Sequence, residues 1–312
     1  MGFYHKPVLL EEVMDGLNIK PSGIYVDCTL GGAGHAGEIA RRLGSEGLLV
    51  GLEQDPTAFK VAKNRLGNFD VPQKIIRSNF RFLTNVMDRL SIPLAHGFLA
   101  DLGVSSHQLD EPERGFSYMD DTPLDMRMDP DMELTAEKVV NTYSVERLAK
   151  IIASYGEERW SKRIADFIGK ARDNQPITTT GGLVEIIKAA IPAGARRKGP
   201  HPAKRTFQAL RIEVNDELGA LEDLLERMVD RLAPGGRICI ISFHSLEDRL
   251  VKKAFAEHAV KCICPRDFPK CVCGISPRLK IVTRKPIRAS QEEIEANPRS
   301  RSAKLRIAEK LA

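Results

Sequence analysis

The chain has 312 residues, 42% hydrophobic and 29% charged, which is the composition of an ordinary globular protein with room for one or two domains. No apolar run approaches the roughly 20 residues of a membrane span, the first residues lack the apolar core of a signal peptide, and four of the six cysteines lie within residues 262–273. These features argue against a membrane protein and a secreted disulfide scaffold, so we expect a cytoplasmic protein, whose net charge of +5 allows a polyanionic partner without requiring one.

The first predicted elements, over residues 24–53, are a strand, a glycine-rich turn, a helix and a second strand. The β-prone run Ile24–Thr29 precedes three glycines, at positions 31, 32 and 34. A helical pattern at 36–43 and an apolar strand at 48–52 follow, and Glu53 comes 19 residues after Gly34. Glycines allow close backbone approach, and a carboxylate in this place accepts two ribose hydroxyls. The order predicts a site for an adenosine-containing cofactor, with NAD and S-adenosylmethionine both open.

The same alternation continues to about residue 104. A helix should begin at the Asp55 cap and run to about Leu66, followed by a strand at 74–77, a short helix through residue 90, and a strand at 96–102. Such alternation predicts an α/β protein with a parallel sheet covered on both faces. Ligands bind beyond the carboxyl ends of such strands, where Phe80 lies against an adenine or packs in the core.

Between residues 108 and 202 no strand is predicted. Amphipathic patterns indicate helices at 136–141, 145–155, 160–174 and 182–191. A long helix over 203–232, a buried strand at 237–242 and a helix at 246–258 should follow, and strands at 279–283 and 304–308 should form a terminal pair. We therefore expect an α/β domain in two parts, 1–107 and 203–312, around a helical insertion at 108–202.

The loop after the fourth strand, residues 101–110, bears on the choice of cofactor. A nicotinamide enzyme would need hydride chemistry and usually a proton-transfer group nearby. This loop instead offers the carboxylate of Asp101, small polar residues and the amide of Gln108, which suit hydrogen bonding to planar amines. Asp101 can also simply cap the following turn. The alternatives to an enzyme that uses S-adenosylmethionine are a nicotinamide oxidoreductase and a catalytically silent RNA-binding module.

Nine segments, in the same order along the chain, carry a resemblance to a known family. The chain resembles the bacterial 16S ribosomal RNA cytosine-N4 methyltransferases, the family of small subunit methyltransferase H. The segments are residues 5–10, 31–35, 101–110, 114–119, 123–128, 155–158, 201–208, 242–249 and 297–302. The resemblance therefore extends over nearly the whole chain.

The resemblance implies a Rossmann-like S-adenosylmethionine-dependent methyltransferase fold with a helical insertion domain. It also implies methyl transfer from S-adenosylmethionine to the exocyclic N4 of a decoding-region cytosine in 16S rRNA. The cofactor-binding residues that it implies are Ala33, Gly34, His35, Glu53, Phe80, Asp101 and Gln108. The family often has aspartate at the position of Glu53, and glutamate keeps the bidentate acceptor.

The expected chemistry needs alignment more than a strong base, because the cytosine amine loses its proton after methylation. The candidate catalytic groups are Asp101, Ser105 and His244. In the alternative interpretation, His244 is a packing residue of the core. The rRNA, as free 16S rRNA or in the small ribosomal subunit, would contact basic residues and flip its target base. The predicted RNA-binding residues are Arg196, Arg197, Lys204, Arg205, Arg284, Arg299 and Arg301.

The clustered cysteines form two Cys-x-Cys pairs, Cys262 with Cys264 and Cys271 with Cys273. Four thiols at this spacing can build a tetrahedral zinc site, but Cys-x-Cys pairs are less usual than Cys-x-x-Cys. We expect no metal, and reduced cysteines in a surface loop. The sequence does not determine the oligomeric state and is compatible with a homodimer.

Overall fold

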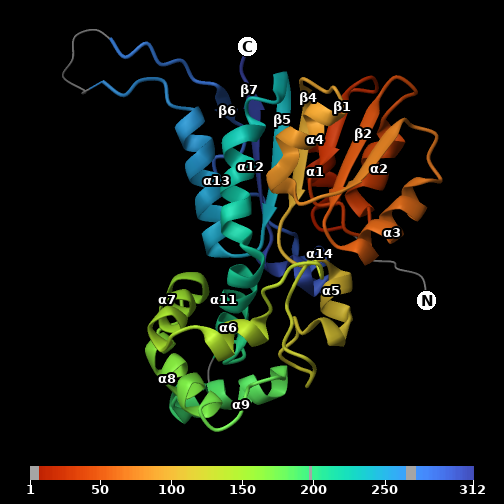
Figure 1. Ribbon diagram of the computed structural model, residues 1–312. Helices are drawn as coiled ribbons and strands as arrows, with labels where there is room; N and C mark the ends of the chain where they lie inside the picture. The colour runs from red at the N-terminus through yellow and green to blue at the C-terminus, as the bar shows by residue number, and fades with distance from the viewer. Residues whose placement is uncertain (1–6, 197–198, 265–271) are drawn as a thin grey trace. The chain divides into compact units, whose positions relative to one another are not determined.

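The computed structural model describes residues 7–196, 199–264 and 272–312. The chain divides into two compact units (Figure 1). The first unit comprises Met1–Gly103 with Gly219–Ala312, and the second comprises Val104–Leu218. Arg197 and Cys271 lie outside the described residues.

A seven-stranded sheet in the order β3-β2-β1-β4-β5-β7-β6 organises the first unit. The first five strands of this order are parallel, β7 is antiparallel to β5, and β6 is antiparallel to β7. The strands are β1 (Ile24–Asp27), β2 (Leu48–Glu53), β3 (Gln73–Arg77), β4 (Ala95–Asp101), β5 (Leu232–Ser242), β6 (Leu279–Ile281) and β7 (Lys304–Lys310). The predicted parallel sheet, the terminal pair and the Rossmann-like α/β fold are confirmed.

Alternation along the strands buries both faces of this sheet. On β4, Phe98 belongs to a core with Leu224 of α12 and Val251 of α13. Its neighbour Leu99 belongs to a second core with Met14 of α1. The helices of this unit are α1 (Leu10–Leu17), α2 (Gly34–Arg42), α3 (Pro56–Leu66), α4 (Leu83–Arg89), α12 (Glu217–Met228), α13 (Ser245–His258) and α14 (Gln291–Ala296), with 3-10 turns η1 (Phe80–Phe82) and η3 (Pro298–Ser302). Helix α1 was not among the predicted elements.

The predicted cap of α3 is present. The Asp55 side chain is fully buried and accepts hydrogen bonds from the backbone N–H groups of Thr57 (2.8 Å) and Ala58 (3.5 Å), with Pro56 in the first turn. The cap fixes where β2 ends and α3 begins, and so holds the loop that carries Glu53.

We expect Asp55→Ala to lower the free energy of unfolding by about 1–2 kcal/mol, because two helix N–H groups lose their acceptor in a buried place. Urea denaturation measures this change. Ser290→Ala, which removes the cap of the exposed helix α14, should cost less. Equal losses of unfolding free energy in the two variants would contradict the larger contribution expected of the buried cap.

The second unit is built mainly from helices. They are α5 (Ser106–Asp110), α6 (Ala136–Thr142), α7 (Val145–Gly156), α8 (Ser161–Arg172), α9 (Thr180–Ala190), α10 (Ala193–Arg196) and α11 (Lys204–Asn215), with the 3-10 turn η2 (Pro112–Arg114). Leu148, Ile164, Ile187 and Leu210 lie in one shared core. Among its described residues, β-pairing is limited to an isolated bridge between Pro123 and Thr179. A role for this unit in substrate recognition remains a prediction.

The single helix predicted over 203–232 is wrong. It is two helices, α11 and α12, separated at Asp216, whose φ of 47° is left-handed. The buried side chain of Asn215 accepts a hydrogen bond from Met128 N (2.7 Å) and donates one to Met126 O (2.8 Å). These tertiary bonds hold the end of α11 on a distant segment, and aspartate tolerates the left-handed conformation that follows.

Among the described residues, no helix combines the length and apolar character needed to cross a bilayer.

Candidate cofactor and catalytic site

Several acidic side chains lie at the carboxyl edge of the sheet. Asp27, Glu53 and Asp101 are the last residues of β1, β2 and β4. Parallel pairing of β1 with both β2 and β4 brings these three strand ends to one edge. This is the edge at which open α/β sheets bind ligands.

The glycine-rich turn has an unusual backbone. Gly31 has a φ of 50°, and Ala33, which precedes the first residue of α2, has a φ of 57°. The left-handed conformation at a non-glycine residue is strained and is held here by the bond from Ala33 N to Leu30 O (2.7 Å). A Cβ on Gly34 would lie 2.4 Å from Cγ of Pro7. The turn therefore fits only a residue without a side chain at position 34.

Glu53 connects the first two loops of the site. Its Oε2 accepts a hydrogen bond from Gly31 N (2.8 Å), and its Oε1 accepts one from Asp55 N (2.8 Å). Burial raises the pKa of Glu53 to about 7 against the opposing effect of these bonds. A carboxylate offers about four acceptor positions, so the side chain can still accept ligand hydroxyls.

Asp101 carries the clearest mark of a binding site. Its backbone N–H donates to Thr29 Oγ1 (2.6 Å), and its Oδ2 lies 3.7 Å from His35 Nδ1. Its Oδ1 is buried without a hydrogen-bond partner. Burial, and then the nearby carboxyls of Asp27 and Glu247, raise the pKa of Asp101 to about 8. An unsatisfied buried oxygen is costly, and a bound ligand with a donor or a positive charge would satisfy it.

Asp27 was missed in the sequence analysis. It is 1% exposed, its Oδ1 accepts a hydrogen bond from Thr29 N (3.1 Å), and burial raises its pKa to about 7. The signal was present, because Asp27 ends the first strand as Glu53 and Asp101 end theirs. We call Asp27, Glu53 and Asp101 the carboxyl cluster; with these pKa values, Asp101 is mostly protonated and the other two are about half protonated near pH 7.

His35 supports the site as a neutral ring. Its Nε2 lies 2.9 Å from Val8 O, and a carbonyl only accepts, so Nε2 carries the proton and Nδ1 does not. Burial lowers the pKa of His35 to about 4, against the opposing effect of this bond. The ring thereby fastens the start of α2 to the segment before α1 and turns an acceptor nitrogen toward Asp101. A direct contact to the cofactor remains a prediction.

The end of β3 is joined to the end of β2 by two amides. Asn79 donates to Gln54 Oε1 (2.6 Å), and its own Oδ1 caps the turn by accepting from Arg81 N (2.9 Å). Phe80 is partly buried and packs against the core that contains Phe98. The core-packing alternative for Phe80 is therefore realised in part, and its contact with an adenine remains a prediction.

His244 caps α13. Its Nδ1 accepts a hydrogen bond from Glu247 N (3.4 Å), and Glu247 Oε2 accepts from Phe243 N (2.8 Å) and His244 N (3.2 Å). The His244 Nε2 atom lies 3.2 Å from Glu247 Oε1 without hydrogen-bond alignment. This capping box gives His244 a structural task. Its catalytic role remains a prediction.

Ser105 and Gln108 belong to the second unit and bind each other. Ser105 N donates to Gln108 Oε1 (2.9 Å), and Gln108 N donates to Ser105 Oγ (3.2 Å). This reciprocal pair fastens the start of α5, and Gln108 is 4% exposed. Their participation in a pocket with Asp101 remains a prediction.

The predicted RNA-binding residues fall on both units. In the second unit, Arg196, Lys204 and Arg205 are exposed, and Arg205 Nη1 donates to Glu157 O (3.1 Å). In the first unit, Arg284 and Arg301 are exposed and Arg299 is partly buried. Exposure is what phosphate contacts require, and it does not by itself identify a binding surface.

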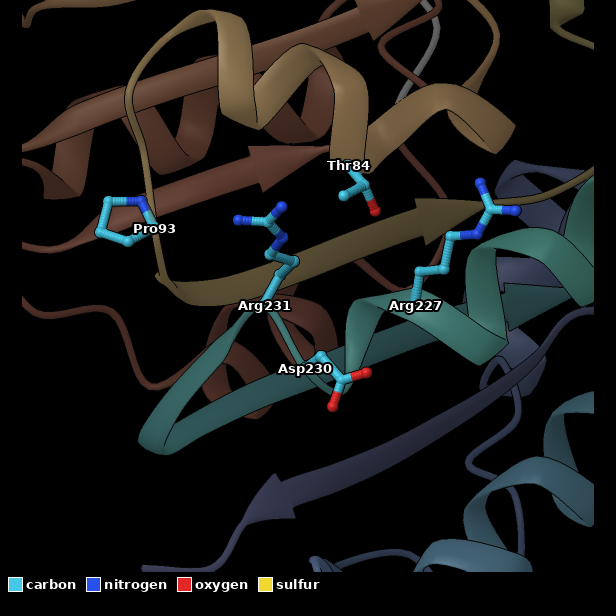
Figure 2. A pocket seen from close by; sticks show the side chains of 5 residues that line it. All are labelled: Thr84, Pro93, Arg227, Asp230 and Arg231. Carbon is cyan, nitrogen blue, oxygen red and sulfur yellow. The ribbon is translucent and has the colours of Figure 1, made fainter.

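A pocket of about 420 Å³ lies at the other edge of the sheet (Figure 2). Its lining residues are Thr84, Pro93, Arg227, Asp230 and Arg231. Arg231 immediately precedes β5, and its carbonyl accepts from Ala95 N at the start of β4 (2.8 Å). The pocket therefore lies at the amino ends of these strands, away from the carboxyl cluster.

Comparisons with known proteins cover the whole chain. Residues 2–311 match the MraW methylase family. A ribosomal RNA small subunit methyltransferase H of Symbiobacterium thermophilum is 58% identical over 311 residues, which is 100% of this chain and 98% of that protein. The protein of the same name from Clostridioides difficile is 56% identical over 100% of both chains. A solved rRNA methylase of Streptococcus thermophilus aligns with a TM-score of 0.43 and 10% identity, over 97% of this chain and 94% of that one.

Proposed function

The chain belongs to the MraW methylase family, and from this premise we propose that it methylates small-subunit ribosomal RNA with S-adenosylmethionine as the methyl donor. The acceptor in this proposal is the exocyclic N4 of a decoding-region cytosine in 16S rRNA. The relatives named ribosomal RNA small subunit methyltransferase H support the substrate class. The observation that carries the proposal is the carboxyl cluster around the buried, unsatisfied Oδ1 of Asp101.

The residues at the strand ends fit this cofactor. A Cβ on Gly34 would collide with Pro7, and Gly31 and Ala33 have left-handed φ values, so these residues fix a tight turn whose backbone a nucleoside can approach. Glu53 accepts backbone hydrogen bonds from Gly31 and Asp55, and a carboxylate has further lone pairs for ribose hydroxyls. Asp101 and Asp27 supply negative charge, once ionised, for a cationic group. S-adenosylmethionine supplies a methyl group carried on positively charged sulfur.

The chain's own groups then have defined tasks. Ionised Asp101 accepts an N–H of the cytosine amine and turns its lone pair toward the methyl group. The Thr29 hydroxyl, bonded to Asp101 N, fixes the end of β4 during this alignment. The amine becomes acidic once methylated, so the released proton can pass to a carboxylate or to water. No cysteine nucleophile is needed for reaction at an amine.

The direct test is methylation of 16S rRNA, free and in small subunits, by the purified protein with labelled S-adenosylmethionine. We expect N4-methylated cytidine after digestion and mass analysis of the nucleosides. Comparing the two substrates shows whether the free RNA or the assembled subunit is used. Methylation at a ring carbon would contradict the amine chemistry, and tighter binding of NAD than of S-adenosylmethionine would contradict the reaction class.

The exposed basic residues of the second unit are proposed to contact RNA phosphates. The double variant Arg196→Glu and Lys204→Glu should weaken rRNA binding and reduce the salt slope of log K by about 0.7–0.9 for each phosphate that the protein no longer neutralises. Filter binding at several salt concentrations measures both quantities. Lys150→Glu reverses an exposed charge on α7 outside the basic stretch and should change the slope less. An unchanged slope in the double variant would remove these residues from the interface.

Further parts of the proposal concern assembly and place of action. A homodimer remains a prediction that sedimentation of the purified protein can test. Ribosomal RNA as substrate would place the activity in the cytoplasm.

A further inference from the structure

A long segment between α13 and β6 is not used by the proposed reaction. We call residues 259–278 the cysteine loop; its described parts are 259–264 and 272–278. Arg278 N donates to His258 O (2.7 Å), so the two ends of the loop are joined next to α13. In Figure 1 the two described arms extend away from the sheet. The described arms contain neither helix nor strand, and long irregular connections commonly have a function of their own.

Three cysteines converge in this loop. The Sγ atoms of Cys262, Cys264 and Cys273 all lie within 4.8 Å of one another. The Sγ atoms of Cys262 and Cys273 are 3.8 Å apart. In a tetrahedral zinc site with Zn–S bonds of about 2.3 Å, neighbouring sulfurs are about 3.8 Å apart. The observed spacing therefore already suits a zinc ion.

Two of these sulfurs accept backbone hydrogen bonds. Cys264 N donates to Cys262 Sγ (3.4 Å), and Val272 N donates to Cys264 Sγ (3.4 Å). Backbone N–H groups that donate to a ligating sulfur orient it towards the metal. Backbone donors from both arms of the loop thus point at the cluster. Two unconnected pairs of surface cysteines would have no reason to show this arrangement.

Core packing does not hold the two described arms of the loop together. Ile263 is 67% exposed and Val272 is 73% exposed, so the apolar side chains beside the cysteines contribute little core. The described cysteines form no disulfide. Small segments without a core are commonly held by a metal or a disulfide. Three partly exposed sulfurs, with two of them at zinc-site spacing rather than at the S–S bond length of about 2.05 Å, favour the metal.

We propose that Cys262, Cys264 and Cys273 bind one zinc ion that ties the two arms of the cysteine loop together. Three thiols lose their protons to solvent, and three Zn–S bonds form. Thiolate ligands select zinc over hard cations such as magnesium. The sequence alone led us to expect no metal, and the convergence of the two arms is the new observation. The proposal is independent of methyl transfer.

The test is the zinc content of the full chain, produced without an affinity tag that binds metal and purified under reducing conditions without chelator. We expect about one zinc per chain in the wild type, and near-zero zinc in Cys262→Ser, Cys264→Ser and Cys273→Ser. Cys239→Ala serves as the matched control, because Cys239 is fully buried in β5, and it should keep the metal. Circular dichroism shows whether each variant is folded.

Two further measurements on the wild-type protein test the zinc site even if a cysteine variant folds poorly. Cobalt added to metal-free wild type should give the visible absorption of a tetrahedral thiolate site, and zinc should abolish it. Chelator should increase tryptic cleavage within the loop, at Lys261 for example, and added zinc should reverse this. Wild type that binds neither metal when fully reduced would overturn the proposal. A Cys262–Cys273 disulfide in protein isolated without reductant, with no zinc bound after reduction, would also overturn it.

Discussion

Asp101→Asn is expected to reduce methyl transfer about 100-fold, as the loss of a charged hydrogen bond of about 2.7 kcal/mol would do. The amide keeps the shape of the side chain but cannot supply a full negative charge to the amine or to a cationic cofactor. Steady-state methylation of 16S rRNA measures the effect. Asp88→Asn, which changes an exposed carboxyl on α4 paired with Arg231, should retain activity. Near-wild-type turnover in Asp101→Asn would remove Asp101 from the reaction.

A stability measurement separates this loss from misfolding. The pKa of Asp101 in the folded protein, about 8, lies above the value near 4 of an unfolded chain. The contribution of protonated Asp101 to the free energy of unfolding is therefore complete below about pH 4 and is lost as the pH rises through 8. Asp101→Asn lacks this loss, so its unfolding free energy relative to wild type should increase between pH 5 and pH 8.

The contribution of Asp248 to stability should have the opposite pH dependence. Burial raises the pKa of Asp248, but hydrogen bonds from Arg306 (2.7 Å) and Lys304 (3.1 Å) outweigh it and lower the pKa below its usual value. Its stabilising contribution is present above about pH 4 and is lost as the pH falls. Asp248→Asn should therefore destabilise the protein at pH 8. Equal pH dependence in the two variants would contradict the assigned electrostatics.

The affinity for S-adenosylmethionine should rise with pH between pH 6 and pH 8, by up to about tenfold per pH unit for each proton that binding releases. The carboxyls of Asp27 and Glu53, with pKa values of about 7, and of Asp101, with a pKa of about 8, hold protons at pH 6. A cation favours their ionised form, so binding must release protons below these pKa values. Isothermal titration calorimetry in buffers of different ionisation enthalpy measures both the affinity and the protons released.

S-adenosylhomocysteine is the matched ligand for this measurement, because its sulfur is uncharged. Its affinity should depend less on pH, since only contacts such as those to the ribose remain coupled to Glu53. Glu53→Gln should weaken both ligands, whereas Asp101→Asn should flatten the pH dependence of S-adenosylmethionine more than that of S-adenosylhomocysteine. Parallel pH profiles for the two ligands would show that the carboxyl cluster does not face the sulfur.

The parallel sheet and the edge at which the site lies follow from the sequence alone. Apolar runs that alternate with amphipathic helices leave a parallel sheet as the stable arrangement, and such a sheet brings all strand ends to one edge. Glu53 and Asp101 were placed there because each ends an apolar run. The same rule would have found Asp27, which was passed over beside the glycines. The start of α3 was also predictable, since the Asp55 cap and the proline after it act within one turn.

The protonation and orientation of the site side chains depend on the tertiary structure, because their partners come from distant parts of the chain. His35 is neutral because burial outweighs the opposing effect of its bond to Val8, and Asp101 is oriented by Thr29, 72 residues away. The helix over 203–232 breaks because Asn215 bonds to residues almost 90 positions earlier. The cysteine spacing alone led us to expect no metal, and the convergence of three sulfurs from the two arms is what supports the proposed zinc site. Local periodicity determines where elements form, whereas protonation, capping and ligand geometry depend on burial and contacts that only the folded chain supplies.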